Sequence, residues 1–344
     1  MTYRLAINGY GRIGRCVLRA LYESSRFPEF EVVGINELSN IESIAHLTRF
    51  DSTHGRFQGE VAYRQETLLI NGHAIAVSFE KELSRLPWKE LGVDLVMECS
   101  GAFTQRAAAE EHIRSGAGRV IFACPAGADV DATIVFGINE KTLKKAHTVI
   151  SNASCTSNCI TPVIHVLDCH LGIKQGMITT IHSMMNDQPV IDAYHNRDLR
   201  KSRSSSQSVI PVHTELPSGV DRLLPHLAGR FQAIALRVPI TNVSAMQLTV
   251  QVNTKTDVRE VNRILKTAAE GRLSGILGYT DLPLVSCDFN HDPRSAVIDG
   301  SQTRVFGGTG LSGGTGVSVL AWFDNEWGYA NRMLDTARAL LTAE

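Results

Sequence analysis

The stretch YRLAINGYGRIG, residues 3–14, decides the fold of the first half of the chain. Its first six residues are mostly apolar and predict a short strand, which runs into three glycines, Gly9, Gly11 and Gly14. In this G-x-G-x-x-G spacing the first glycine permits a tight turn, the second lets the backbone approach a pyrophosphate, and the third lets a helix pack closely on the strand. Residues 12–23 carry apolar side chains at helical spacing, so the stretch predicts a strand, a turn and a helix arranged to bind a dinucleotide.

An acidic residue further along supports this interpretation. Residues 31–36 form a second apolar segment of strand type, and Glu37 follows it directly. A carboxylate at this place can bond the adenosine ribose hydroxyls and repels a 2′-phosphate, which favours NAD over NADP. Arg12 is open to two interpretations, a solvated helix charge or a contact with the pyrophosphate. The predicted NAD-binding set is Gly9, Gly11, Arg12, Ile13, Gly14 and Glu37.

Strand-like and helix-like segments alternate through the rest of the first half. Apolar runs at residues 94–98, 119–123 and 148–151 predict strands, and residues 105–115 predict a helix. Such alternation is typical of a parallel sheet with helices on its faces. We therefore expect a Rossmann-type, doubly wound α/β domain.

The second half has a different pattern. Runs rich in β-branched residues follow one another with few helices between them, and residues 258–270 are the clearest helix. This arrangement predicts an α+β domain with a mostly antiparallel sheet. A glycine-rich segment, residues 306–316, is expected to be a flexible loop between strands. The strand-like runs are residues 176–182, 232–239, 243–252, 284–289, 296–299 and 317–323.

The length of the chain and the change of pattern predict two domains. A chain of 344 residues exceeds what a single core usually accommodates. We expect an NAD-binding domain over residues 1–154 and a catalytic domain over residues 155–325. A C-terminal helix within residues 326–344 is expected to pack back onto the first domain.

The composition excludes several classes of protein. The formal net charge of −1 provides no global field for nucleic acid or for an anionic membrane. No apolar run reaches the roughly 18 residues that a membrane helix needs, and the first residues lack a signal-peptide pattern. The seven cysteines are odd in number and dispersed, which favours a reducing cytoplasm over a disulfide framework. No second pair of Cys or His stands at zinc-site spacing, so no metal is expected.

One cysteine stands in an unusual setting. The segment SNASCTSNC, residues 151–159, follows a predicted strand and precedes an apolar helical pattern, which places Cys155 at or near a helix N-terminus. That position lowers a thiol pKa, and a neighbouring histidine lowers it further. Hydrogen-bonding residues surround Cys155, whereas Cys159, one turn later, is expected to be buried and inert. His182 ends a later predicted strand and is the candidate partner, because catalytic groups are common at strand ends.

Four motifs extend this reading over essentially the whole chain. They are NGYGRIGR (residues 8–15), SNASCTSNC (151–159), LRVPITNVS (236–244) and WFDNEWGYANR (322–332). In this order they resemble the glyceraldehyde-3-phosphate dehydrogenase superfamily. Further segments are similar to the branch of that superfamily that oxidises D-erythrose 4-phosphate, among them FDSTHGRF (50–57) and SQSVIPV (206–212).

The resemblance implies an NAD-dependent aldehyde dehydrogenase with assigned site residues. Cys155 is implied to be the nucleophile, and His182 the base that activates it. Asn325 is implied to fix the nicotinamide carboxamide, and Arg237 to bind the phosphate of the substrate. Further substrate and anion contacts are implied for Ser154, Thr156, Arg200 and Thr214. The resemblance also implies a homotetramer in which residues 183–208 pack across subunits.

Two positions depart from the pattern of the glyceraldehyde enzymes. Met185 stands where they place a threonine that donates to the substrate phosphate, and Glu215 stands where they place a glycine. A thioether donates no hydrogen bond, and a carboxylate repels a nearby anion, so both changes speak against tight binding of glyceraldehyde 3-phosphate and inorganic phosphate. The alternatives are a phosphorylating glyceraldehyde-3-phosphate dehydrogenase, or a non-catalytic protein of this fold that binds RNA through the basic run at residues 197–203.

Overall fold

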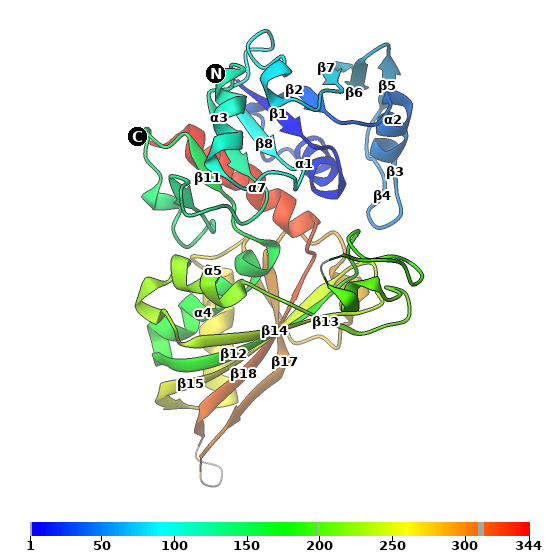
Figure 1. The fold of residues 1–344 in the computed structure, drawn as a ribbon. Coiled ribbons are helices and arrows are strands. Elements are labelled where there is room, and N and C mark those ends of the chain that lie inside the picture. Colours follow the sequence, from blue (N-terminus) through cyan, green and yellow to red (C-terminus); the bar gives the residue numbers. More distant parts are fainter. Residues whose placement is uncertain (1, 197, 309–312) are drawn as a thin grey trace. The chain divides into compact units, whose positions relative to one another are not determined.

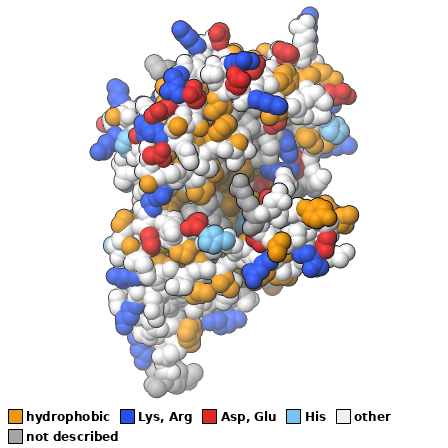
Figure 2. All heavy atoms as spheres, viewed as in Figure 1, with side chains coloured by type: hydrophobic (Ala, Val, Ile, Leu, Met, Phe, Trp, Pro, Cys, Tyr) orange, Lys and Arg blue, Asp and Glu red, His pale blue; other side chains and the backbone are white. Residues whose placement is uncertain are grey.

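A computed structural model describes residues 2–196, 198–308 and 313–344. The chain forms two compact units (Figure 1). Unit 1 consists of Met1–Ser154 and Tyr329–Glu344, and unit 2 consists of Cys155–Gly328. Among the helices of the described ranges, none combines the length and the apolar content needed to cross a bilayer. Cationic and anionic side chains are interspersed on the face that Figure 2 shows, in keeping with the net charge of −1.

Unit 1 is built around a nine-stranded sheet. Its strands are β1 (Tyr3–Asn8), β2 (Phe30–Asn36), β5 (Val61–Arg64), β6 (Thr67–Ile70), β7 (His73–Ser78), β8 (Leu95–Glu98), β9 (Arg119–Phe122), β10 (Ala132–Thr133) and β11 (Val149–Ser151). The order is β10-β11-β9-β8-β1-β2-β7-β6-β5. All pairs from β10 to β7 are parallel, which confirms the predicted parallel sheet. The pairs β7–β6 and β6–β5 are antiparallel and form an edge that the sequence did not predict.

The helices of unit 1 follow mainly from local sequence. Helix α1 (Arg12–Tyr22) begins directly after the glycine turn, and α3 (Arg106–Arg114) confirms the second predicted helix. Helix α2 (Ile41–Arg49) was not predicted, although its N-terminal signal is present in the sequence. Asn40 caps it by accepting a hydrogen bond from the backbone N–H of Ser43 at 2.8 Å. A short hairpin of β3 (Phe50–Asp51) and β4 (Gly55–Arg56) follows.

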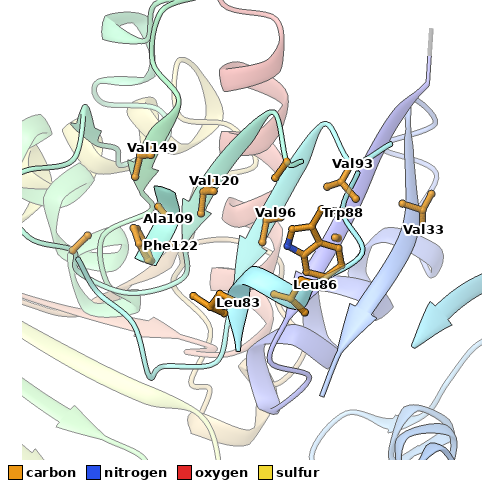
Figure 3. Close-up of a cluster of buried hydrophobic side chains, with 13 residues drawn as sticks. Val33, Leu83, Leu86, Trp88, Val93, Val96, Ala109, Val120, Phe122 and Val149 are labelled. Atoms are coloured by element: carbon orange, nitrogen blue, oxygen red, sulfur yellow. The ribbon is translucent and has the colours of Figure 1, made fainter. Parts of the chain in front are cut away.

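Trp88 lies in a buried apolar cluster of unit 1 (Figure 3). Its indole is fully buried among Leu86, Val93 and Val96. Gly34 on β2 leaves room for the ring, because a Cβ at that position would lie 3.1 Å from Cζ3 of the indole. A buried indole removes a large apolar area from water, so this cluster fixes the loop before β8 firmly on the sheet.

The C-terminal helix α7 (Trp327–Leu341) belongs to unit 1 from Tyr329 onward. The Tyr329 hydroxyl donates to the carbonyl oxygen of Ala153 at 2.9 Å, and Thr336 Oγ1 donates to Asn152 Oδ1 at 2.7 Å. All four of these residues are buried or nearly so. The last part of the chain is therefore part of the core of the N-terminal unit.

Unit 2 is built around a seven-stranded sheet. Its strands are β12 (Ile173–His182), β13 (Ile210–Val212), β14 (Phe231–Arg237), β15 (Ser244–Thr256), β16 (Leu277–Thr280), β17 (Ala296–Phe306) and β18 (Gly314–Phe323). The order is β13-β14-β12-β15-β18-β17-β16. Within the described part of this second sheet, only β12–β14 and β16–β17 are parallel pairs, so the predicted mostly antiparallel sheet is confirmed. Helices α4 (Cys155–Leu171) and α6 (Val258–Glu270) pack against the strands.

The strand directions bring three chain segments to one edge of this sheet. β14 is parallel to β12, and β18 runs in the same direction because both β12 and β18 are antiparallel to β15. The carboxyl ends of β12, β14 and β18 therefore lie at the same edge. These ends are His182, Arg237 and Phe323, which Asn325 follows closely. The topology thus gathers three of the predicted site segments, although they are far apart in the sequence.

The prediction of a strand over residues 284–289 is wrong. The segment contains a short 3₁₀ helix, Ser286–Phe289. Asp288 Oδ2 accepts a hydrogen bond from the backbone N–H of Val285 at 2.8 Å, a local bond that competes with strand pairing. The ring of Phe289, at the end of this helix, stacks on Trp322, with ring centroids 5.6 Å apart. The side-chain cap and this tertiary contact outweigh the β propensity of the segment.

Two other segments of unit 2 differ from the sequence prediction. Helix α5 (Leu216–Leu223) was not predicted, because it is short and contains both a proline and a glycine. The glycine-rich segment joins two antiparallel strands, β17 and β18, as predicted. β18 begins at Gly314, within that segment, and residues 309–312 lie outside the described residues. The flexibility of this loop stays a prediction.

Candidate active site

Unit 1 contains a cavity of about 330 Å³ at the glycine turn. Its walls come from the carboxyl ends of neighbouring parallel strands, where doubly wound sheets bind their ligands. They include Asn8 at the end of β1, Glu37 after β2 and Ser100 after β8, together with Gly9 and Gly11. Two of the three predicted glycines, Gly9 and Gly11, therefore line one cavity together with the predicted carboxylate of Glu37.

The three glycines have different physical reasons to be glycine. Gly9 has a φ of +84°, and a Cβ there would lie 2.3 Å from Ser100 Cα. A Cβ at Gly14 would lie 2.3 Å from the carbonyl oxygen of Gly9. At Gly11, by contrast, no atom of the described residues lies within 4 Å of a built Cβ. The turn thus packs tightly on the protein side and leaves open backbone beside the cavity, which fits a pyrophosphate.

Glu37 is held with its carboxylate at the cavity. Its Oε2 accepts a hydrogen bond from the Tyr10 backbone N–H at 2.8 Å, and its Oε1 accepts one from the Leu38 backbone N–H at 2.7 Å. Each oxygen keeps a further lone pair for a ribose hydroxyl. The glycine turn itself orients the acid, because Tyr10 lies between two of its glycines.

The structure speaks against Arg12 as a freely solvated helix charge, and its contact with the pyrophosphate stays a prediction. Its guanidinium forms an ion pair with Asp51, in which Nη2 lies 3.2 Å from Oδ1 and Nη1 contacts Oδ2. Burial opposes ionisation of Asp51, but Arg12 and the backbone N–H groups of Thr53 and His54 hold its pKa at about 2. Arg12 is therefore anchored at the start of α1, where Ile13 follows it, rather than freely solvated.

The central pair of unit 2 is Cys155 with His182. Cys155 is the first residue of α4, as predicted, and its Sγ lies 3.8 Å from His182 Nε2. His182 Nδ1 lies 2.8 Å from the carbonyl oxygen of Ser183. Because that oxygen can only accept, Nδ1 carries the proton of the neutral ring and the lone pair of Nε2 faces the sulfur. Phe323 packs edge-on against the imidazole, with ring centroids 6.2 Å apart, and restricts its rotation.

The expected low pKa of the thiol is not found. Burial raises the pKa of Cys155 to about 11, although the N–H groups of Cys155 and Thr156 lower it, and Glu326 raises it further. Burial also lowers the pKa of His182. A helix N-terminus and a neighbouring histidine both favour the thiolate, but in this site the free-energy cost of enclosing an ion outweighs them. At neutral pH the pair is a thiol beside a neutral imidazole that can receive its proton.

Asn325 is held in one orientation by two hydroxyl groups that the sequence reasoning missed. Its Oδ1 accepts hydrogen bonds from Ser183 Oγ at 3.0 Å and from Ser244 Oγ at 2.8 Å. Ser244 Oγ also accepts from the Ser183 backbone N–H at 3.1 Å. With its oxygen fixed in this way, the amide turns its Nδ2 donors away from the two serines. That orientation suits a donor to the carbonyl of a carboxamide.

The turn that carries Asn325 is itself anchored. Asp324 Oδ1 accepts from the backbone N–H of Trp327 at 2.8 Å, and Asp324 Oδ2 accepts from that of His291 at 2.7 Å. The ring of His291 stacks on Trp327, with centroids 3.6 Å apart. The turn after β18 is therefore clamped from both of its sides.

Arg237 lies next to His182 and carries partners that were not predicted. The two residues are register partners in the parallel strands β12 and β14. The guanidinium forms a bidentate pair with Asp187, and its Nη1 also donates to Gln188 Oε1 at 2.9 Å. Lys201 Nζ binds the same aspartate at 2.7 Å. Burial opposes ionisation of Asp187, but these two cations lower its pKa. A buried cation with a carboxylate partner therefore stands beside the Cys155–His182 pair.

The predicted hydroxyl groups of the second anion pocket lie at the starts of two helices. Thr156 is in the first turn of α4, and α5 packs beside that turn, since a Cβ at Gly219 would lie 3.3 Å from Ser157 Oγ. Thr214 stands just before α5, and its Oγ1 accepts the first hydrogen bond from that helix at 3.2 Å. Two helix N-termini with adjacent hydroxyls favour an anion.

Arg200 and Ser154 are less directly connected with this group. Arg200 lies on the 3₁₀ helix Leu199–Ser202 with its side chain exposed, and the neighbouring Lys201 is the cation that reaches Asp187. Ser154 is the last residue of the first segment of unit 1. The roles of these two residues stay predictions.

A dinucleotide cavity on a parallel sheet, followed in the same chain by a cysteine–histidine pair, defines an NAD-dependent oxidoreductase. Residues 3–106 match the model of the glyceraldehyde 3-phosphate dehydrogenase NAD binding domain, and residues 154–325 match the model of the glyceraldehyde 3-phosphate dehydrogenase C-terminal domain. The chain belongs to the glyceraldehyde 3-phosphate dehydrogenase family, and its cofactor is NAD.

Proposed function

We propose that this protein uses NAD to oxidise D-erythrose 4-phosphate to 4-phospho-D-erythronate through a thioester on Cys155, a reaction that serves the biosynthesis of pyridoxal phosphate. The observation that carries the chemistry is the Cys155 Sγ–His182 Nε2 distance of 3.8 Å, with the lone pair of the nitrogen facing the sulfur. The choice of aldehyde rests on two side chains, Met185 and Glu215.

The first step joins the aldehyde to the sulfur. His182 Nε2 takes the thiol proton as Sγ of Cys155 attacks the carbonyl carbon, and the N–H groups of Cys155 and Thr156, which face the sulfur, can stabilise the negative oxygen. The imidazolium then returns its proton to that oxygen and leaves a thiohemiacetal. NAD, when bound, supplies the hydride-accepting ring.

The second step makes and breaks the thioester. His182 removes the hydroxyl proton of the thiohemiacetal as the carbon is oxidised, which leaves a thioester on Cys155. His182 then releases that proton to solvent and, neutral again, takes a proton from the water that attacks the thioester; the carbon–sulfur bond breaks, and the sulfur recovers this proton from His182. The acid is released, and the cysteine and histidine return to their starting protonation states.

Arg237 is proposed to bind the phosphate of the substrate. A guanidinium has five N–H donors, and among the described residues Asp187 and Gln188 occupy three of them. Two donors remain for a phosphate oxygen. Asp187 neutralises part of the positive charge, so the site can hold Arg237 buried in the absence of substrate.

The choice of aldehyde is proposed from Met185 and Glu215. Met185 is half exposed in the segment after β12 and can donate no hydrogen bond to a phosphate. Glu215 is exposed at the start of α5, where its Oε1 contacts His213 Nε2. A negative charge at this helix N-terminus opposes a second anion such as inorganic phosphate. Both features favour a longer substrate whose thioester is released by water.

The proposal is tested by measuring NADH formation from two aldehydes, each with and without inorganic phosphate. D-erythrose 4-phosphate is expected to react faster than D-glyceraldehyde 3-phosphate, at a rate that phosphate does not change. Faster reaction of the triose with an absolute need for phosphate would show a glycolytic phosphorylating enzyme instead. No NADH from either aldehyde, combined with salt-sensitive retention of RNA, would favour a binding protein.

The basic run gives that last alternative little support. Arg197 lies outside the described residues. Lys201 pairs with Asp187, and Arg203 Nε lies 2.8 Å from the carboxylate of Asp192. Cations that are already paired with carboxylates contribute less to the binding of nucleic acid phosphates.

A double substitution, Met185→Thr with Glu215→Gly, tests the substrate choice directly. It supplies a hydroxyl donor and removes a negative charge, so we expect phosphate-dependent oxidation of D-glyceraldehyde 3-phosphate to rise about tenfold, the worth of roughly one charge-assisted hydrogen bond. The measurement is kcat/KM for the triose at fixed phosphate. The control is Met177→Thr, which makes the same change at a different exposed methionine, one that lies on β12. An unchanged kcat/KM in the double variant removes the argument from these two residues.

The assembly and the compartment are part of the same proposal. Residues 183–208 are proposed to pack across subunits of a homotetramer, which is supported by the near-complete exposure of the apolar side chains of Tyr194 and Leu199. No disulfide bond joins any of the seven cysteines, all of which lie in the described ranges, and this supports the proposal of a reducing compartment, the cytoplasm.

A further inference from the structure

A buried carboxylate lies behind the cofactor cavity of unit 1. Glu98 ends strand β8, and its side chain is completely enclosed. Its Oε2 accepts from Asn8 Nδ2 at 2.5 Å and from His112 Nε2 at 3.0 Å, and its Oε1 accepts from the N and Oγ of Ser100 at 2.8 and 2.5 Å. The carboxyl group of Glu98 thus accepts four hydrogen bonds and holds the four donors in fixed positions.

The neighbouring imidazole is held in one tautomer. Trp88 Nε1 lies 2.9 Å from His112 Nδ1. An indole nitrogen can only donate, so Nδ1 of His112 is an acceptor and the ring proton is on Nε2, which faces Glu98. In an imidazolium, the Nδ1–H group of His112 would point at the Nε1–H group of Trp88, and the two donors would repel each other. Neutral His112 therefore accepts a hydrogen bond from the Trp88 indole at Nδ1 and donates one to the Glu98 carboxylate from Nε2. We call the three side chains Trp88, His112 and Glu98 the relay.

The starting point of the relay cannot move easily. Trp88 is fully buried in the apolar cluster of Figure 3, where Leu86, Val93 and Val96 surround its ring. Gly34 lies directly beneath it on β2. Because this ring is fixed on the sheet by close packing, it gives His112 a defined position and, through His112, gives one to Glu98.

The other end of the relay forms the wall of the cofactor cavity. Asn8 and Ser100, which both donate to Glu98, both line that cavity. The backbone of Ser100 also packs against Gly9, at a distance that would leave no room for a Cβ there. Asn8 Oδ1 in turn accepts from Asn36 Nδ2 at 2.7 Å. Glu98 thus holds the turn after β8 against the glycine turn after β1.

We propose that His112 is a positioning residue for NAD. It is not among the residues that line the cavity, and it acts through Glu98 on Asn8 and Ser100. The inference depends on the family's cofactor and not on the aldehyde proposed above, so the two can fail separately. A side chain that accepts a hydrogen bond on one atom and donates one from another should therefore preserve NAD affinity in place of the neutral ring. An apolar side chain should not preserve it.

The test compares His112→Gln with His112→Leu in the full-length enzyme. Glutamine keeps an acceptor for Trp88 and a donor for Glu98 on one amide, whereas leucine leaves both partners unsatisfied in the interior. NAD affinity is measured by titration calorimetry without substrate, and kcat is measured at saturating NAD. We expect His112→Leu to raise the Kd for NAD about tenfold. We expect His112→Gln to stay within about threefold and kcat to change little in either variant.

Trp88→Phe keeps the experiment decisive if the leucine variant does not fold. It removes the indole donor and leaves an aromatic ring in the cluster, so the Kd for NAD is expected to rise by a few-fold with kcat unchanged. Native affinity in both His112→Leu and Trp88→Phe would overturn the proposal. A glutamine variant as weak as the leucine variant, at equal thermal stability, would also overturn it, because a neutral donor–acceptor pair would then be insufficient.

Discussion

Replacing Cys155 with alanine is expected to lower NADH formation by at least about 10³-fold, the order of effect of removing a covalent nucleophile. In the proposed chemistry the sulfur is the atom that bonds to the substrate, and it lies 3.8 Å from His182 Nε2. The Kd for NAD should stay within a few-fold, because the cofactor cavity of unit 1 does not include this residue. Steady-state kinetics and a binding titration on the same preparation measure both quantities.

Cys159 provides the matched control for this experiment. It lies one turn further along α4 and is completely buried, with a pKa that burial raises well above its ordinary value. Cys159→Ala removes a small apolar group from the interior and should leave turnover close to that of the native enzyme. Turnover that survives in Cys155→Ala, or that disappears equally in both variants, contradicts the assignment of the nucleophile.

Replacing His182 with asparagine is expected to lower kcat by about 10²- to 10⁴-fold, the usual range for a positioned general base. Asparagine can still donate to the Ser183 carbonyl oxygen in place of Nδ1, so the backbone contact is kept while the acceptor at Nε2 is lost. The fold of the site should therefore survive. The loss of rate then reports on proton transfer from Cys155 and not on a collapsed strand end.

Alkylation of Cys155 by iodoacetamide gives a second readout that does not depend on substrate. Since burial raises the pKa of this thiol to about 11, the thiolate fraction of the native enzyme grows as the pH rises toward that value. The alkylation rate should therefore increase across the alkaline range, and His182→Asn should lower the rate at neutral pH. A rate that is already at its plateau near pH 6 would show a resting thiolate and contradict the neutral pair.

Helix α4, which begins at Cys155, contains a second imidazole–thiol pair that serves as a control. His165 Nε2 lies 3.7 Å from Cys169 Sγ, at a surface position. His165→Asn should change neither kcat nor the alkylation of Cys155. A loss of kcat in His165→Asn as large as the loss in His182→Asn would mean that the His182→Asn result does not report specifically on the Cys155–His182 pair.

Much of the fold could be read from local patterns. The run into Gly9, Gly11 and Gly14 predicted β1, the turn and α1 nearly residue by residue, because a mostly buried parallel strand and an amphipathic helix have different periods. The change to β-branched runs predicted the second sheet. The failures were local competitions, such as the 3₁₀ helix Ser286–Phe289, where a side-chain cap and a ring stack outweighed strand propensity.

The cysteine and histidine of the candidate site were predictable from the sequence as neighbours, and the groups around them were not. Cys155 and His182 were identified from a helix start and a strand end, which are local features. The groups that hold Asn325 and Arg237 were not identified, because Ser183, Ser244 and Asp187 reach them only after strands from distant parts of the chain have paired. No periodicity in a sequence reports such contacts.

The amino-acid sequence by itself determined which backbone could turn at the glycines, which faces of strands and helices must be buried, and which cysteine is the candidate nucleophile. These properties depend on neighbours within about two helical turns. Only the tertiary structure decided the charge state of Cys155, the orientation of Asn325 and the neutral form of His112. Each of these depends on solvent exclusion and on partners far away in the chain, since an ion or a hydrogen bond is stabilised by its three-dimensional surroundings.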